Sequence, residues 1–269
     1  MMRFHFYVGL LIISVAEILL FFGVTWIKIF FTPLVWTGYI LLIDGIVFKI
    51  KKKSWIMNRA KTFLIMAGLS ILFWYGFEFF NLFIKNWRYV GLPAALWVQT
   101  IGFTWAFATI GPAMFETADL LTCAVAFRIK TKTFQTPKGI LYTISVIGAL
   151  CLLSLLVTPH SIAQYLVTFL WLGPLLLFDP LNYLRGRKSI IRNWEQGNIQ
   201  IFLCLLVAGT ICGFLWEFWN YWATTKWVYQ LAYLAEPKIF EMPLFGYLGF
   251  PLLTLDYYAL YSFVLKWKD

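Results

Sequence analysis

Carboxyl and amide side chains recur at one spacing in two apolar stretches of the chain. Glu78 is followed by Asn81, and Glu217 by Asn220, so each pair shares one face of a helix. A carboxyl group that lies near an amide in an apolar helix can donate or accept a proton. The pairs therefore predict acid–base chemistry, with polar contacts between helices as the structural alternative.

Two further acids follow prolines that are well placed to begin helices. Glu116 lies shortly after Pro112, and Asp256 shortly after Pro251, which predicts both carboxyls about one turn into a helix. The positive end of a helix favours a charged carboxylate. Carboxyls in contrasting surroundings commonly divide acid and base roles. The predicted catalytic residues are Glu78, Glu217, Glu116 and Asp256, and capping with solvation is the alternative for the last two.

Asp44 and Asp179 lie nearer the basic ends of their apolar stretches. Arg185 and Arg187 follow Asp179 closely. A structural salt bridge to a basic loop is the interpretation that we favour for these two acids.

Aromatic residues crowd around the acids. A Trp-x-Tyr sequence occurs twice, at Trp87 to Tyr89 and at Trp227 to Tyr229. Aromatic faces can stabilise a cation, although many such residues serve only as interfacial anchors. The predicted substrate-binding residues are Asn81, Asn220, Trp87, Trp227, Tyr89, Tyr229, Trp74 and Trp216.

These matches belong to an internal repeat. At an offset of 135 residues Trp36, Gly38 and Asp44 match Trp171, Gly173 and Asp179, and after a basic loop the offset becomes 139 to 140. We therefore expect two related halves, residues 1–130 and 131–269, that run in the same direction across a membrane.

Apolar stretches long enough to cross a bilayer fill the chain, which is 61% hydrophobic and 13% charged. We predict an all-α, polytopic bundle of eight spans in two parallel four-helix repeats: 5–24, 33–49, 62–84, 112–129, 139–157, 162–183, 199–222 and 251–267. Residues 86–111 and 223–250 are expected on the outer side as interfacial or re-entrant segments.

The net charge of +10 is distributed like that of a membrane protein rather than a nucleic-acid-binding one. Basic clusters fall at residues 49–61, 128–138, 185–192 and 266–268, all on one side of the predicted topology. The positive-inside rule makes that side cytoplasmic, with both termini there, in a plasma (inner) membrane.

The sequence lacks the residues that several kinds of chemistry require. His5 and His160 are the only histidines and lie near span ends, which argues against a metal centre. The four cysteines sit in apolar stretches and form no C-x-x-C pair. No phosphate-binding glycine loop or nucleophile motif is present. We expect neither a metal nor a cofactor.

One stretch resembles the small membrane lycopene cyclases. The likeness is carried by Lys226 to Tyr229, Met242-Pro243, Gly249 to Pro251, and Asp256, and it covers about a third of the chain. The resemblance implies tandem transmembrane repeats with acids near a proline, and an isoprenoid substrate. The family's Pro-x-Glu-Glu pair is absent, since Leu244 and Phe245 follow Pro243.

Together these features predict a protein that binds or modifies a lipid or isoprenoid between its halves by acid–base chemistry. A proton-coupled secondary transporter is the first alternative. A non-catalytic membrane assembly partner is the second. The expected partners are membrane lipids and a hydrophobic small molecule, with no nucleic acid, and a second copy of the chain is a further candidate partner.

Overall fold

The computed structural model describes residues 3–124 and 130–265 as a helical bundle. The first helices and strand are α1 (Phe4–Phe21), α2 (Thr25–Lys51), α3 (Trp55–Asn58), α4 (Ala60–Ile84), β1 (Trp87–Val90) and α5 (Leu96–Ala124). There follow α6 (Lys138–Val157), α7 (His160–Ala163), α8 (Val167–Leu184), α9 (Ile190–Glu195), α10 (Gln200–Trp222), β2 (Lys226–Tyr229), β3 (Lys238–Ile239), β4 (Met242–Pro243), the 3-10 helix η1 (Leu244–Leu248) and α11 (Gly249–Val264). The expectations for residues 125–129, Lys266 and Lys268 lie outside the described residues.

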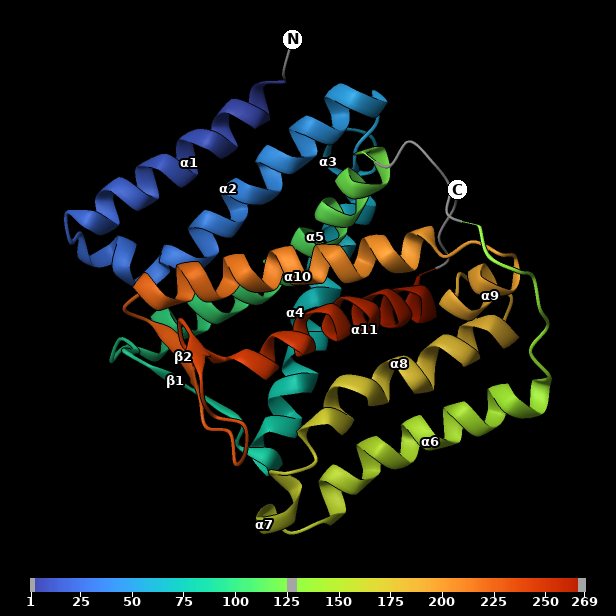
Figure 1. Cartoon of the computed structure of the whole chain (residues 1–269). Coiled ribbons are helices and arrows are strands. Elements are labelled where there is room, and N and C mark those ends of the chain that lie inside the picture. The colour runs from blue at the N-terminus through green and yellow to red at the C-terminus, as the bar shows by residue number, and fades with distance from the viewer. Residues whose placement is uncertain (1–2, 125–129, 266–269) are drawn as a thin grey trace.

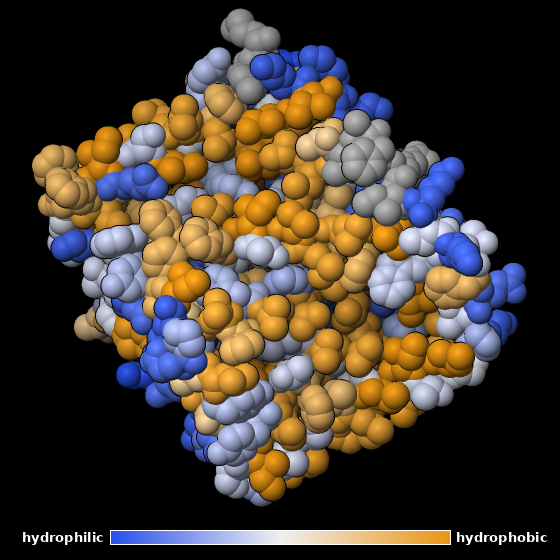
Figure 2. Space-filling model, viewed as in Figure 1, coloured by the Kyte–Doolittle hydropathy of each residue, from blue (hydrophilic) through white to orange (hydrophobic). Residues whose placement is uncertain are grey.

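The long helices run roughly side by side, and polar segments lie at the two ends of the bundle. Figure 1 shows α3 and α9 at one end, with β1, β2 and α7 at the opposite end. Apolar side chains cover most of the face shown in Figure 2, and hydrophilic ones gather near those two ends. This is the surface of a multi-pass membrane protein.

Within the described residues, six helices are long and apolar enough to cross a membrane: α1, α2, α4, α6, α8 and α10. The other two predicted spans correspond to α5 and α11, which lie among the remaining helices; α5 contacts α2, α4 and α10, and α11 contacts α8 and α10. Glu116 of α5 and Asp256 of α11 are buried in protein.

The predicted start of a span at residue 112 is wrong. Residues 96–111 are helical and continuous with the predicted span at 112, because Pro112 does not end α5. The Ser70 hydroxyl of α4 donates to Phe107 O at 2.6 Å and accepts Gly111 N–H at 2.9 Å. The hydroxyl is thus inserted between Phe107 O and Gly111 N–H, which would otherwise bond each other within the helix.

Close glycine contacts join the outer helices to their neighbours in both halves. A Cβ atom at Gly9 of α1 would lie 2.5 Å from Gly38 O of α2. One at Gly148 of α6 would lie 2.8 Å from Gly173 O of α8. Small residues let helix backbones approach closely in a membrane, and Gly38 and Gly173, which match in the sequence repeat, each meet a glycine of the preceding helix.

We predict that Gly148→Val lowers the thermal unfolding midpoint in detergent, because forcing a side chain into a packed crossing costs about 1–3 kcal/mol. The control is Gly68→Val on α4, where an added Cβ meets nothing within 4 Å. Equal midpoints for the two variants would contradict the close α6–α8 crossing.

Candidate functional site

A pair of short strands joins the two halves at one end of the bundle. β1 and β2 are antiparallel, with Trp87 opposite Tyr229 and Tyr89 opposite Trp227. Each Trp-x-Tyr sequence thus places its Trp against the Tyr of the other. The residues that match in the sequence therefore take equivalent places about the centre of the strand pair.

Asn81 and Asn220 fix the strands to the helices that precede them. The Asn81 amide donates to Trp87 O at 2.8 Å and accepts Trp87 N–H at 3.3 Å. Asn220 donates to Trp227 O at 2.9 Å and accepts Trp227 N–H at 3.1 Å. Both side chains are occupied by backbone, so the structure places these predicted substrate-binding residues in a supporting position.

Glu78 of α4 receives hydrogen bonds from three aromatic donors. Trp74 Nε1 lies at 2.9 Å from Glu78 Oε1, Trp87 Nε1 at 3.0 Å, and Tyr89 OH at 2.5 Å. The carboxyl is half-buried. A carboxyl held by several donors has a fixed orientation, as an acid–base group requires.

Glu217 of α10 has the matching partners but one donor fewer. Trp227 Nε1 donates to its Oε1 at 3.1 Å and Tyr229 OH at 2.7 Å, while Oε2 lacks a hydrogen-bond partner among the described residues. The position that corresponds to Trp74 is Gly213, against which the Phe250 ring packs. Glu217 is fully buried.

The two strand tyrosines keep their protons. Burial and the adjacent Glu78 carboxyl raise the pKa of Tyr89 well above its ordinary value. Burial and Glu217 do the same to the pKa of Tyr229. Each hydroxyl is therefore a permanent donor to its carboxyl near neutral pH.

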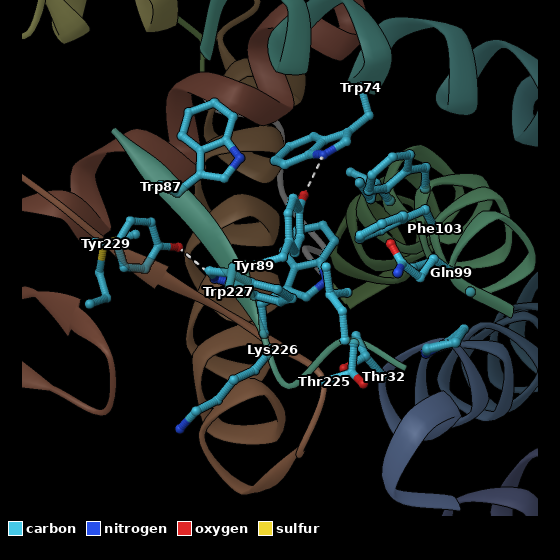
Figure 3. A pocket seen from close by; sticks show the side chains of 18 of the residues that line it. Thr32, Trp74, Trp87, Tyr89, Gln99, Phe103, Thr225, Lys226, Trp227 and Tyr229 are labelled. Atoms are coloured by element: carbon cyan, nitrogen blue, oxygen red, sulfur yellow. Dashed lines mark hydrogen bonds between the residues drawn. The ribbon is translucent and has the colours of Figure 1, made fainter. Parts of the chain in front are cut away.

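A cavity of about 120 Å³ lies beneath the strand pair. Its wall combines aromatic residues from both halves with few polar groups, and Figure 3 shows the rings of Trp74, Trp87, Tyr89, Phe103 and Trp227 gathered around it. Six of the predicted substrate-binding residues line it: Trp74, Trp87, Tyr89, Trp216, Trp227 and Tyr229. The four predicted catalytic carboxyls do not line it, so Glu78 and Glu217 reach the cavity only through the Trp and Tyr side chains that donate to them.

Glu116 and Asp256 lie away from this cavity, inside the bundle. Glu116 is on α5, which begins twenty residues earlier at Leu96, so the expected place in a first helical turn is wrong. Asp256 is about two turns into α11, and accepts Leu175 N–H at 2.8 Å. Neither carboxyl has the exposure to water that capping with solvation implied.

Asp44 and Asp179 hold the short helices of the two loops. Asp179 accepts the N–H groups of Ile190 and Ile191 at 2.7 and 3.1 Å and the Ser189 hydroxyl at 3.0 Å. Asp44 accepts the Ser54 hydroxyl and Ile56 N–H, both at 2.9 Å. These partners are hydroxyl and amide groups at the start of α9 and α3, in place of the arginines that we expected.

Sequence reasoning missed part of the cavity wall. Trp171 matches Trp36 in the repeat, but its place against Trp87, with ring centroids 6.1 Å apart, had no signal in the sequence. Phe103, Phe107 and Gln99 belong to the apolar segment that we had assigned to the outer surface. The aromatic content of that segment was the available signal.

Comparison with protein-family models, with curated proteins and with solved structures found no match to this chain. Among the described residues no group of three or more His, Cys, Asp and Glu side chains is arranged to hold a metal ion.

We predict that Asn81→Ala destabilises the protein by about 1–3 kcal/mol, because it leaves buried backbone groups of β1 without a partner. Thermal unfolding in detergent measures the loss. Gln164→Ala is the control, since the Gln164 amide only donates to Ser161 O on the surface. A change at Asn81 no larger than at Gln164 would show that the amide does not hold the strand.

Proposed function

We propose that the protein binds the apolar part of a lipid or isoprenoid in the cavity beneath β1 and β2, and acts on it by acid–base chemistry. The observation that carries this proposal is an aromatic cavity, lined from both halves, whose two tyrosine hydroxyls each contact a carboxyl group. Ligand sites are commonly apolar with few polar groups. An apolar cavity of about 150 Å³ is known to accept benzene, so this one suits a ring or a short piece of chain.

The proposal includes two repeats with eight membrane spans in total. In this arrangement α5 and α11 span the membrane at the centre of the bundle. The element order repeats, the glycine crossings match, and the pairing of β1 with β2 is symmetric. A twofold axis along the membrane normal accounts for all three. The end that carries α3 and α9 is basic, and we assign it to the cytoplasmic side of the plasma membrane.

The proposed chemistry moves a double bond or closes a ring. Tyr229 gives its proton to one carbon of a double bond and takes another from protonated Glu217. Tyr89 then removes a proton from a neighbouring carbon as its own passes to the Glu78 carboxylate, which three donors stabilise. A proton returns from Glu78 to Glu217 before the next turnover. The substrate gains and loses one proton, so no oxidant is required, and the aromatic walls stabilise the cation between the two steps.

The resemblance to the lycopene cyclases also implies an isoprenoid substrate, which is the type of substrate proposed here. The proposed chemistry differs from the sequence-based prediction in one respect. Glu116 and Asp256 neither line the cavity nor hydrogen-bond a side chain that lines it, so we assign the acid and base roles to Glu78 and Glu217 alone.

We predict that Gly102→Leu reduces the amount of hydrophobic ligand that copurifies with the protein, because Gly102 lines the cavity. Solvent extraction and mass spectrometry, at equal protein amounts, measure the bound molecules. Gly76→Leu is the matched control: it makes the same change in a helix where an added Cβ meets nothing within 4 Å. Equal ligand content in both variants would argue against the cavity as the binding site.

We predict that Glu78→Gln and Glu217→Gln each abolish conversion of a bound polyene while ligand content is retained, because glutamine keeps a similar shape but cannot transfer the proton. Chromatography of extracted polyenes after incubation with the purified protein measures conversion. If the wild-type protein bound the polyene without converting it, the protein would be a carrier and the enzymatic part of the proposal would be refuted.

A further inference from the structure

A second group of buried polar side chains lies inside the first half, away from the cavity. Asp44 and Glu116 are almost completely buried, at 0% and 1% exposure. Among the charged groups, Asp44 acts most strongly on the Glu116 carboxyl. His5 Nε2 of α1 lies 2.9 Å from Asp44 Oδ1, and the His5 side chain is 13% exposed.

The Glu116 carboxyl has no donor of its own. Neither oxygen of Glu116 finds a hydrogen-bond donor among the described residues. Two ionised carboxylates can only repel each other, and a hydrogen bond between them forms only when one carries a proton. The other nearby groups are Tyr39 of α2 and the ion pair of Lys51 with Asp119.

Hydrogen bonds extend from this group toward the second half. The Tyr39 hydroxyl lies 2.8 Å from Thr117 Oγ1, which lies 3.3 Å from Cys212 Sγ on α10. These are neutral groups, so they do not neutralise a second negative charge at Glu116. The nearest cation, Lys51, is already paired with Asp119.

The second half lacks the same arrangement. Asp256 stands where Glu116 is expected, is one methylene shorter, and bonds Leu175 N–H. Asp179 is occupied by three donors of its own. His5 lies four residues before Gly9, and the residue four before Gly148 is Ile144. The first half alone therefore joins two carboxyls to an imidazole.

We propose that Asp44 and Glu116 form a proton-binding site, which shares one proton between the two carboxyls and exchanges it with the basic end of the bundle through His5. The partly exposed imidazole links the buried pair to water. The site does not depend on the cavity ligand. A proton reservoir inside the first half could serve either an acid–base enzyme or a proton-coupled carrier.

Infrared spectroscopy of the protein in lipid bilayers tests the site, because a protonated carboxyl has its own carbonyl absorption. Glu116→Gln should remove a protonated-carboxyl band that the wild-type protein shows and that Asp179→Asn retains. Glu116→Asp keeps the carboxyl but shortens the side chain to the length of Asp256, so it should shift the band. Retention of every such band, unshifted, in both Glu116 variants would overturn the proposal.

The role of His5 has its own readout. After transfer to heavy water, the band should shift several-fold more slowly in His5→Phe than in the wild-type protein. His160→Phe is the matched control, since the His160 side chain is exposed and its Nδ1 lies 3.0 Å from a backbone oxygen of α4, Phe83 O. Equal exchange rates in the His5 variant and the wild-type protein would overturn the path through His5. This outcome is independent of whether a ligand binds in the cavity.

Discussion

A carboxyl group inside an apolar helix needs hydrogen-bond donors, because lipid supplies none. In this chain the donors come from segments that fold back onto the helices. β1 and β2 bring Trp and Tyr donors to Glu78 and Glu217. The starts of α3 and α9 do the same for Asp44 and Asp179. The acids thus position the connecting segments, and the cavity forms where two of those segments pair.

The two halves share this scaffold and differ in what it holds. Glu78 has a third donor, Trp74, where the other half has Gly213. Glu116 interacts with Asp44, whereas the shorter Asp256 binds a backbone amide. A duplicated scaffold with unequal acids is suited to divided roles, one carboxyl giving a proton and another receiving it.

Much of the helical framework could be predicted from the sequence, because apolar length and basic clusters are strong signals in membrane proteins. The start of α5 could not. Its apolar residues 96–111 fitted either a helix or an outer segment, and the side chain that supports the bend near Pro112 is Ser70 of another helix. Four-residue strands are too short for a periodic signal.

The site was only partly predictable for the same reason. The Trp-x-Tyr repeats and the Glu-x-x-Asn pairs identified the residues that gather at β1 and β2. Their roles depend on contacts across the chain, so the asparagines proved to bind backbone and the carboxyls to lie behind tyrosines. The most direct test is a cryo-EM map of the protein in nanodiscs made from its own membrane. We predict elongated apolar density beneath paired β1 and β2, with Tyr89 and Tyr229 between that density and the carboxyls. Separated strands, or Glu78 and Glu217 facing acyl chains, would contradict the account.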